Sequence, residues 1–148
     1  MMRISDYLDS RLIAFLDVNT RDQAIDRLIS LLDEDKVSQE RFRKAIHQRE
    51  QIVSTGIGMG VALPHAKLKE LTDFFIVIGI QPKKGLDWNS LDKAPVRLIF
   101  MIGGPDDRQT EYLQILSLLT SAIRDLEMRK KLLNATSEEE VLALFSQF

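Results

Sequence analysis

The sequence predicts a single α/β sandwich domain that spans residues 1–148. Three observations predict it. Short apolar runs typical of strands alternate with helical periodicities along the whole chain. The length of 148 residues suits one domain, and no repeat, low-complexity tract or linker divides it. The apolar fraction of 45% is enough to bury a core without disulfides or structural metal.

Strand and helix signals alternate in the first third of the chain. Leu12–Val18 is a short apolar run rich in branched and aromatic residues, and it predicts a strand. Thr20 then begins a helix, and Gln23 three residues later completes a capping box. Ser38 is a good N-cap for a second helix, which we expect to reach about Glu50.

The pattern changes between residues 52 and 66, where three glycines alternate at Gly56, Gly58 and Gly60. Glycines at this spacing exclude a stable helix. We therefore expect a glycine-rich loop that runs into a short strand, and we expect Pro64 to end that strand because it lacks an N–H group.

Two further strands and a long helix follow. Phe74–Ile80 predicts a strand, and the nearly continuous apolar run Val96–Ile102 predicts a central strand covered on both faces. The segment PKKGLDWNSLDKAP between them is rich in turn residues. Asp106, with Gln109 three residues on, is expected to cap a long, well-buried helix that reaches about Leu126.

The C-terminal part predicts two short helices. The pattern breaks near Glu127, and a short helix follows to Leu133. Ser137 and Glu140 then form a last capping box before an apolar stripe that ends near Phe145.

Composition excludes several classes of function. The formal net charge of −2 offers no basic field for nucleic acid or an acidic membrane surface. There are no cysteines, which excludes disulfides, thiol catalysis and thiolate zinc sites. The first residues lack the apolar core of a secretory signal, and no apolar run approaches the ~20 residues needed to span a bilayer. We expect a cytoplasmic protein with no nucleic-acid partner and no direct membrane insertion.

His65 is the leading candidate for a reactive residue. A neutral imidazole is a good nucleophile near neutral pH. Pro64 fixes the backbone just before the ring, and the glycines upstream allow main-chain N–H groups to approach an anion. Arg49 at the end of the preceding helix could supply a planar fork for phosphate. The alternative is that a lone histidine is structural.

The glycine segment has an alternative explanation too. It is not a dinucleotide fingerprint, because position 63 is leucine, and it is not a Walker A loop, because no Gly-Lys-Ser/Thr follows. By itself it would be a tight or bulged turn. Ser54 and Thr55 just before it either donate hydrogen bonds to a ligand or complete that turn.

Other candidates for chemistry are weaker. His47 is expected on the solvated side of its helix, and the two histidines lack the spacing of a metal site. No order of Ser, His and Asp supports a triad. Trp88, the single tryptophan, is expected to be half-buried in packing, with an exposed partner anchor as the alternative.

A long block of this sequence resembles the signature of the fructose/mannitol family of phosphotransferase IIA domains, to which the nitrogen-regulatory IIA protein belongs. The block comprises Arg-Glu at 49–50, Ser-Thr-Gly-Ile-Gly-x-Gly at 54–60 and Pro-His at 64–65. The resemblance extends through the strand at 96–102, the helix after Gln109 and the terminal helix.

The resemblance implies a mixed sheet flanked by helices and a phosphocarrier function. By resemblance, His65 accepts a phosphoryl group from an HPr-type phosphohistidine protein and passes it to a IIB domain or holds it as a regulatory signal. Arg49 is expected to steady the phosphoryl oxygens, and Ser54, Thr55, Gly56 and Gly58 to line the phosphoryl site. No metal or other cofactor is implied.

The sequence departs from the family pattern at the start of the long helix. Tyr112 stands where the family has a second histidine close to the first. A tyrosine can donate a hydrogen bond to a phosphoryl oxygen, but it stays neutral. Ala66 replaces a frequent glycine, a mild change.

These features leave three versions of the function open. The first is a relay of phosphate, with partners docking on an apolar rim for which Met59, Leu63 and Leu68 are candidates. The second is a regulatory protein that is phosphorylated at the same residue and binds target proteins. The third, motivated by Tyr112, is a binding protein of the same fold that carries no phosphate.

Overall fold

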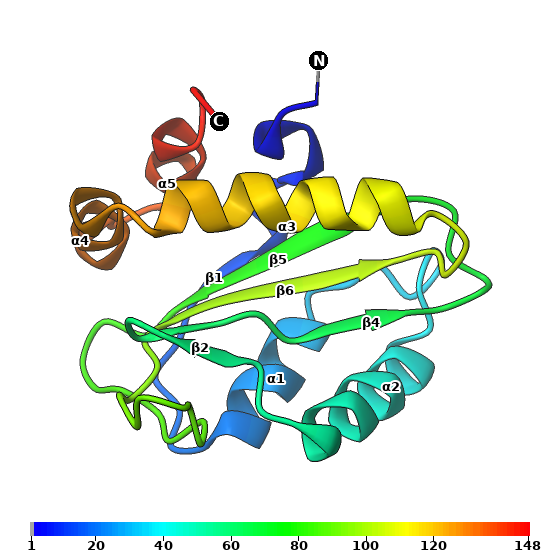
Figure 1. Ribbon diagram of the computed structural model, residues 1–148, viewed down its shortest axis with the longest axis horizontal. Coiled ribbons are helices and arrows are strands. Elements are labelled where there is room, and N and C mark those ends of the chain that lie inside the picture. Colours follow the sequence, from blue (N-terminus) through cyan, green and yellow to red (C-terminus); the bar gives the residue numbers. More distant parts are fainter. Residues whose placement is uncertain (1) are drawn as a thin grey trace.

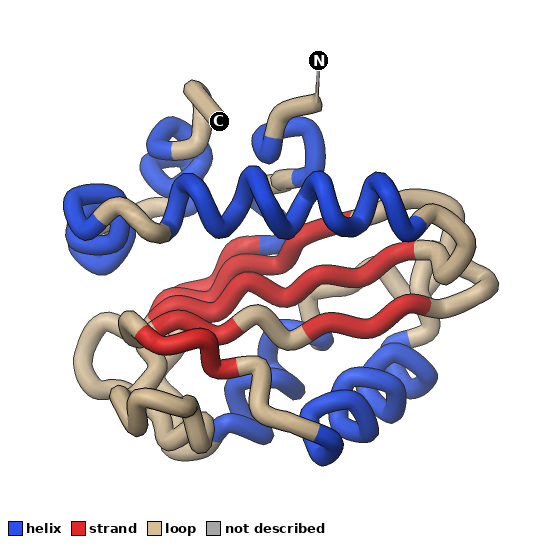
Figure 2. The backbone as a smooth tube through the Cα atoms, viewed as in Figure 1, coloured by secondary structure: helices blue, strands red, loops and turns tan. Residues whose placement is uncertain are grey.

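The computed structural model describes residues 2–148, in which one β-sheet lies between two groups of helices (Figure 1). Figure 2 shows the strands as a single layer with helices above and below it. The α/β class and the mixed sheet are both confirmed. The strands are β1 (Ile13–Phe15), β2 (Gly56–Gly58), β3 (Val61–Ala62), β4 (His65–Lys67), β5 (Phe75–Ile80) and β6 (Leu98–Gly104).

The six strands are ordered β1-β5-β6-β3-β2, and β4 also pairs with β6. The pairs β1–β5, β3–β6 and β4–β6 are parallel, whereas β5–β6 and β2–β3 are antiparallel. The two longest strands, β5 and β6, therefore form the centre of the sheet. β1 lies on the outer edge of β5, β3 and β4 lie on the outer edge of β6, and β2 lies beyond β3.

Five α-helices cover the two faces. α1 (Arg21–Ile29) and α2 (Gln39–Ile52) pack on one face, and α3 (Gln109–Ile123) crosses the other (Figure 1). α4 (Leu126–Asn134) and α5 (Glu138–Leu144) lie on the same side as α3. No helix among residues 2–148 is both long enough and apolar enough to cross a membrane.

The central strands are apolar throughout because helices cover both of their faces. Alternate residues of β6 point to opposite sides: Phe100 and Ile102 belong to the core under α3, whereas Ile99 and Met101 belong to the core over α1 and α2. All these side chains are at most 1% exposed. The prediction of a central strand covered on both faces is confirmed.

Three of the predicted helix caps are confirmed. The Thr20 hydroxyl accepts from the N–H of Gln23, and Ser38 and Ser137 cap α2 and α5 in the same way. The prediction for Asp106 was wrong. β6 continues to Gly104, a turn occupies residues 106–107, and α3 begins only at Gln109 with no side-chain cap.

Three other expectations need correction. The strand expected over Leu12–Val18 is only three residues long. Two 3₁₀ helices, η1 (Ile4–Tyr7) and η2 (Ser10–Leu12), come before it, so Leu12 belongs to η2, and the strand already ends at Phe15. The glycine segment is a β-hairpin, β2–β3, rather than a loop that leads into one strand. Pro64 does not end the strand region, because β4 begins at His65.

Candidate functional site

His65 is the first residue of a strand that Pro64 interrupts. β3 and β4 pair with β6 in one unbroken register, because Val61 lies opposite Leu98 and His65 lies opposite Ile102. Residues 63 and 64 between them form no ladder pairs. The N–H of Ile102 instead donates to the carbonyl of Pro64 at 2.9 Å. The interruption therefore does not change the register of the sheet. It only takes the backbone just before His65 out of the ladder.

That local departure positions the imidazole. The Nδ1 atom of His65 lies 3.0 Å from the carbonyl oxygen of Leu63. A carbonyl oxygen can only accept, so Nδ1 carries the hydrogen and Nε2 keeps a lone pair. Nε2 is then the nucleophilic atom of the ring.

The environment keeps this ring neutral. Burial lowers the pKa of His65 below its ordinary value of 6.5, because a charged ring is poorly solvated there. The positive charges of Arg49 and Lys67 lower it further, whereas the contact with the Leu63 carbonyl and the charge of Glu50 raise it. The balance favours the neutral form that a nucleophile needs.

Tyr112 lies beside His65, as expected from its place in the sequence. The centroids of the two rings are 5.6 Å apart and the rings are tilted by 46°. Tyr112 is 6% exposed, and it also stacks on Phe74 at 6.2 Å. The Lys67 ammonium lies 4.4 Å from the centroid of the tyrosine ring, a cation–π contact, and donates to Gln109 at 2.5 Å. Among residues 2–148, none forms a hydrogen bond with the Tyr112 hydroxyl, so the tyrosine contacts His65 through its ring.

Arg49 lies in the last turn of α2, and its positive charge influences the pKa values of both His65 and Tyr112. Its charge lowers the pKa of His65 and opposes the rise that burial causes in the pKa of Tyr112. One guanidinium nitrogen, Nη1, donates to the carbonyl of Val53 at 2.9 Å. That bond anchors the guanidinium and leaves its other N–H groups for a ligand.

Ser54 and Thr55 are close to the site along the chain, but their hydroxyls have partners inside the fold. The Ser54 hydroxyl donates to the carbonyl of Trp88 at 2.5 Å and accepts from the N–H of Gly56 at 3.0 Å. Thr55 is 5% exposed, and its hydroxyl donates to Glu50 at 2.5 Å. The indole N–H of Trp88 donates to the same hydroxyl at 3.1 Å.

The sequence interpretation did not predict that Trp88 and Glu50 belong to this hydrogen-bond network. Trp88 is 1% exposed, so the expectation of a half-buried ring was wrong, and its indole N–H binds a residue 33 positions away. Glu50 was noted only as the partner of Arg49 in the motif, yet it is 3% exposed and joins the network. A carboxylate directly before an apolar, glycine-rich segment was the available signal.

The two predicted glycines lie in the β2–β3 hairpin, opposite residues that come before His65 in the chain. Gly56 pairs with Ala62 and lies beside Ser90, where a Cβ atom would come within 2.0 Å of the serine hydroxyl oxygen. Gly58 pairs with Val61, four residues before His65, which at ~3.3 Å per residue is roughly 13 Å away. The structure therefore does not bring Gly58 next to His65.

The rest of the hairpin turn binds an internal carboxylate. The N–H of Met59 donates to Asp92 at 3.1 Å, and Gly58 adopts a positive φ of 93° that glycine tolerates without strain. The turn thus uses its backbone to fasten the long loop at residues 81–95, rather than to face His65.

The predicted apolar rim is only partly exposed. Met59 is 43% exposed, but Leu63 is 6% exposed and belongs to the core, so the expectation for Leu63 was wrong. Large exposed apolar side chains follow Arg49 instead, with Ile52 at 79% and Val53 at 58%. They lie at the end of α2, on the stretch whose carbonyl binds the guanidinium.

His47 lies away from this site. It is partly exposed, as expected, and its Nε2 atom lies 3.0 Å from a carboxylate oxygen of Asp26 on α1. Within residues 2–148, no cluster of three or more His, Cys, Asp or Glu side chains is arranged to hold a metal ion.

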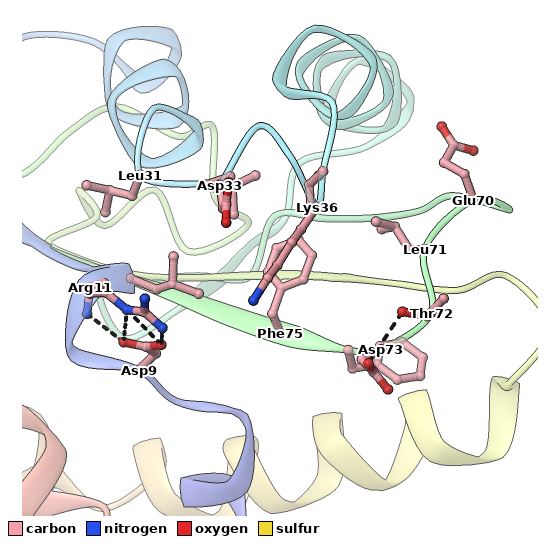
Figure 3. Close-up of a pocket in the computed structure, with 14 residues that line it drawn as sticks. Asp9, Arg11, Leu31, Asp33, Lys36, Glu70, Leu71, Thr72, Asp73 and Phe75 are labelled. Atoms are coloured by element: carbon pink, nitrogen blue, oxygen red, sulfur yellow. Dashed lines mark hydrogen bonds and ion pairs between the residues drawn. The ribbon is translucent and has the colours of Figure 1, made fainter.

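A cavity of about 580 Å³ lies apart from His65, between the loops that precede β1, α2 and β5 (Figure 3). Its lining combines apolar side chains, among them Leu71 and Phe75, with charged ones such as Arg11 and Lys36. Asp9 and Arg11 form an ion pair at 2.6 Å there. Phe74, which also lines this cavity, stacks on Tyr112 beside His65.

Comparisons with known proteins point to one family. Residues 6–148 match the family described as "Phosphoenolpyruvate-dependent sugar phosphotransferase system, EIIA 2". The chain is 34% identical over 149 residues to the PTS system fructose-specific EIIABC component of Bacillus subtilis (strain 168). That match covers 99% of this chain but only 23% of the longer relative.

Solved structures give the same result. The nitrogen regulatory protein IIA-Ntr from Neisseria meningitidis superposes with a TM-score of 0.89 and 26% identity, covering 97% of this chain and 99% of that one. The IIA mannitol enzyme of Escherichia coli, solved in complex with phosphorylated IIB, has a TM-score of 0.79 and 23% identity. It covers 95% of this chain and 98% of that one, and at this identity it supports the fold alone.

Proposed function

Since the chain belongs to the EIIA 2 family of the phosphoenolpyruvate-dependent sugar phosphotransferase system, we propose that it is a phosphocarrier that is phosphorylated on Nε2 of His65. The observation that carries this proposal is the hydrogen bond from Nδ1 to the Leu63 carbonyl. It leaves the Nε2 lone pair free on a ring whose lowered pKa keeps it neutral.

The transfer step requires a phosphohistidine donor and then an acceptor protein with a nucleophilic side chain. The lone pair of Nε2 attacks the phosphorus of the donor's phosphohistidine as the donor's N–P bond breaks, and the donor nitrogen keeps the bonding electron pair. The phosphoryl group then leaves His65 in the same way for an acceptor. The protein's part is to hold the ring in line and to balance charge.

Arg49 is the residue that we assign to the phosphoryl oxygens. Its charge acts on both His65 and Tyr112, and its bond to Val53 leaves further N–H donors. Lys67 on the same strand as His65 adds a second positive charge to the site. We assign Ser54, Thr55 and Gly56 to shaping the loop beside His65, since their hydrogen-bonding groups already have partners.

We propose an HPr-type phosphocarrier protein as the donor. For the acceptor we propose a IIB domain or a regulatory target protein, the first by analogy with the mannitol complex. The exposed Ile52 and Val53 next to Arg49 are suited to the apolar part of such a docking surface. We propose the cytoplasm as the place of action, because phosphoenolpyruvate, which powers this system, is an intermediate of central metabolism.

A regulatory role is the second candidate, and the similarity to a nitrogen regulatory protein favours it. In that version His65 carries the phosphoryl group as a signal, and the output is the binding of a target protein. The two versions share the phosphorylation step and differ in the protein that recognises it.

Incubation with phosphoenolpyruvate, enzyme I and an HPr-type protein tests the shared step. We expect the intact mass to increase by one phosphoryl group, and the modification to be acid-labile and to map to His65. A protein that gains no mass under these conditions would be a binding protein that carries no phosphate. Addition of IIB domains to the phosphorylated protein then separates relay from regulation, because only a relay loses its phosphate to one of them.

A further inference from the structure

We propose that Glu50 is a positioning residue for His65: it holds the segment that orients the imidazole, and its negative charge acts on the ring. This inference rests on the proposed function of His65, and it extends that function to a residue with no direct contact to the phosphoryl group.

Glu50 is a buried carboxylate with an unusual set of partners. It is 3% exposed, and both of its oxygens accept hydrogen bonds from Thr55. The backbone N–H donates to Oε2 at 2.7 Å and the hydroxyl donates to Oε1 at 2.5 Å. Within residues 2–148, no salt bridge joins Glu50 to a basic side chain. A buried charge without a paired cation is costly, which points to a function for the charge.

Hydrogen bonds connect Glu50 to the reactive ring. Glu50 holds Thr55, and the carbonyl of Thr55 accepts from the N–H of Leu63 at 3.0 Å. The carbonyl of Leu63 then accepts from Nδ1 of His65 at 3.0 Å. Trp88 secures Thr55 from the other side through its indole N–H. Because each contact fixes the next, the grip of Glu50 on Thr55 sets the position of the Leu63 carbonyl and, through it, the tautomer of His65.

The charge of Glu50 affects the pKa of His65 in the opposite direction to the charges of Arg49 and Lys67. Arg49 from α2 and Lys67 from β4 disfavour a charged ring, Tyr112 from α3 contributes a neutral ring, and Glu50 favours a charged imidazole. When Nε2 bonds to phosphorus while Nδ1 keeps its hydrogen, positive charge develops on the imidazole. A fixed negative charge stabilises that developing charge, so Glu50 offsets the positive charges of Arg49 and Lys67.

Two substitutions separate the positioning effect from the charge effect. In Glu50→Gln the amide oxygen still accepts from the Thr55 N–H and the amide NH2 donates to the Thr55 hydroxyl, so Thr55 stays held but the charge is lost. In Glu50→Asp the charge remains, but the side chain is one methylene too short to hold both donors of Thr55. Glu40→Gln on the exposed first turn of the same helix is the matched control.

The readout is a ¹⁵N NMR titration of the His65 ring in the unphosphorylated protein. We expect wild type and Glu40→Gln to share one pKa and the Nδ1–H tautomer. In Glu50→Gln the tautomer should remain while the pKa shifts further down. In Glu50→Asp the Nε2–H tautomer should become populated, and the pKa should also fall because the contact with the Leu63 carbonyl that raises it is weakened. A merely structural glutamate would lower stability without moving either signal.

Each arm can overturn its part of the proposal. An unchanged His65 pKa in Glu50→Gln removes the charge role, and an unchanged tautomer in Glu50→Asp removes the positioning role. These measurements need no phosphoryl transfer, so they are independent of the phosphorylation experiment. If wild type gains no phosphate, the proposed function fails while the titration still decides how Glu50 acts on the ring.

Discussion

The Nδ1 atom of His65 and the carbonyl oxygen of Leu63, two residues earlier in the chain, lie 3.0 Å apart. Pro64 lies between them and cannot donate to the sheet, so the chain leaves the ladder at this point and returns to it at His65. The same short segment thus exposes a nucleophilic nitrogen and fixes which nitrogen it is.

Replacement of the nucleophile should abolish phosphorylation. His65→Ala is expected to fold, because the ring is partly exposed at the edge of the sheet, but to incorporate no acid-labile phosphate. Intact-mass measurement after incubation with the donor proteins gives the result. His47→Ala is the control and should be phosphorylated like wild type, because His47 pairs with Asp26 elsewhere on the surface. Loss of phosphate in the control alone would move the assignment to His47.

Arg49→Lys should slow phosphoryl transfer while retaining the positive charge. Lysine cannot both bind the Val53 carbonyl and offer a planar pair of donors to the phosphoryl oxygens. Loss of a charge-assisted hydrogen bond of ~1.5–3 kcal/mol corresponds to a rate roughly ten- to a hundred-fold lower. Rapid-quench measurement of transfer from the phosphorylated donor tests this, and a rate equal to that of wild type would remove Arg49 from the site.

Tyr112→His should increase the rate of phosphoryl transfer. The ring at this position packs against His65, so an imidazole there could share positive charge with the phosphoryl group, which a neutral tyrosine cannot do. Tyr112→Phe is the control and should transfer at the wild-type rate, because the hydroxyl binds no residue in the described part of the chain. A histidine variant that folds but transfers no faster would contradict this account of the substitution.

Protonation of His65 should make stability depend on pH in a defined window. Burial, Arg49 and Lys67 hold the folded pKa below the ordinary 6.5, so the unfolded chain binds a proton first as the pH falls. The free energy of unfolding should therefore decrease as the pH falls from about 6.5 to the folded pKa, and His65 adds no further slope below it. Urea unfolding of wild type and His65→Ala at a series of pH values isolates this contribution. Parallel curves for the two proteins would show that the pKa of His65 is not lowered.

Gly56→Ala should destabilise the hairpin beside the site. The new Cβ would lie 2.0 Å from the Ser90 hydroxyl oxygen and 3.2 Å from its Cα atom, so the loop at residues 81–95 must move. Overpacking of this kind costs ~1–3 kcal/mol. Denaturant unfolding measures the loss, and adding Ser90→Gly should restore part of it by removing the closer atoms. Equal stability of the single and double variants would mean that Ser90 is not the obstacle.

Local signals were sufficient for much of the fold. The caps at Thr20, Ser38 and Ser137 were predicted because the donor and acceptor lie within three residues of each other. The apolar run at 96–102 predicted a covered central strand because the signal is carried by consecutive residues of one segment. Asp106 failed as a cap because β6 runs two residues further than expected, which moves the turn and the helix start along the chain.

In the candidate site too, some residues were placed correctly from the sequence and one was not. His65, Arg49 and Tyr112 were predicted from the motif and its departure, and the structure brings them together at the edge of the sheet. Gly58 was grouped with them because it is near in sequence, but the β2–β3 hairpin extends away from His65 and carries it to the far end.

The sequence by itself determined the class of fold, the candidate histidine and three of the helix caps, because each depends on residues that are neighbours along the chain or on a periodic pattern. Only the tertiary structure decided how the ring is held. Trp88 reaches Thr55 across 33 residues, and Glu50 reaches His65 only through Thr55 and Leu63. Contacts of this kind form when the sheet brings distant segments together and excludes water, and no local pattern records them.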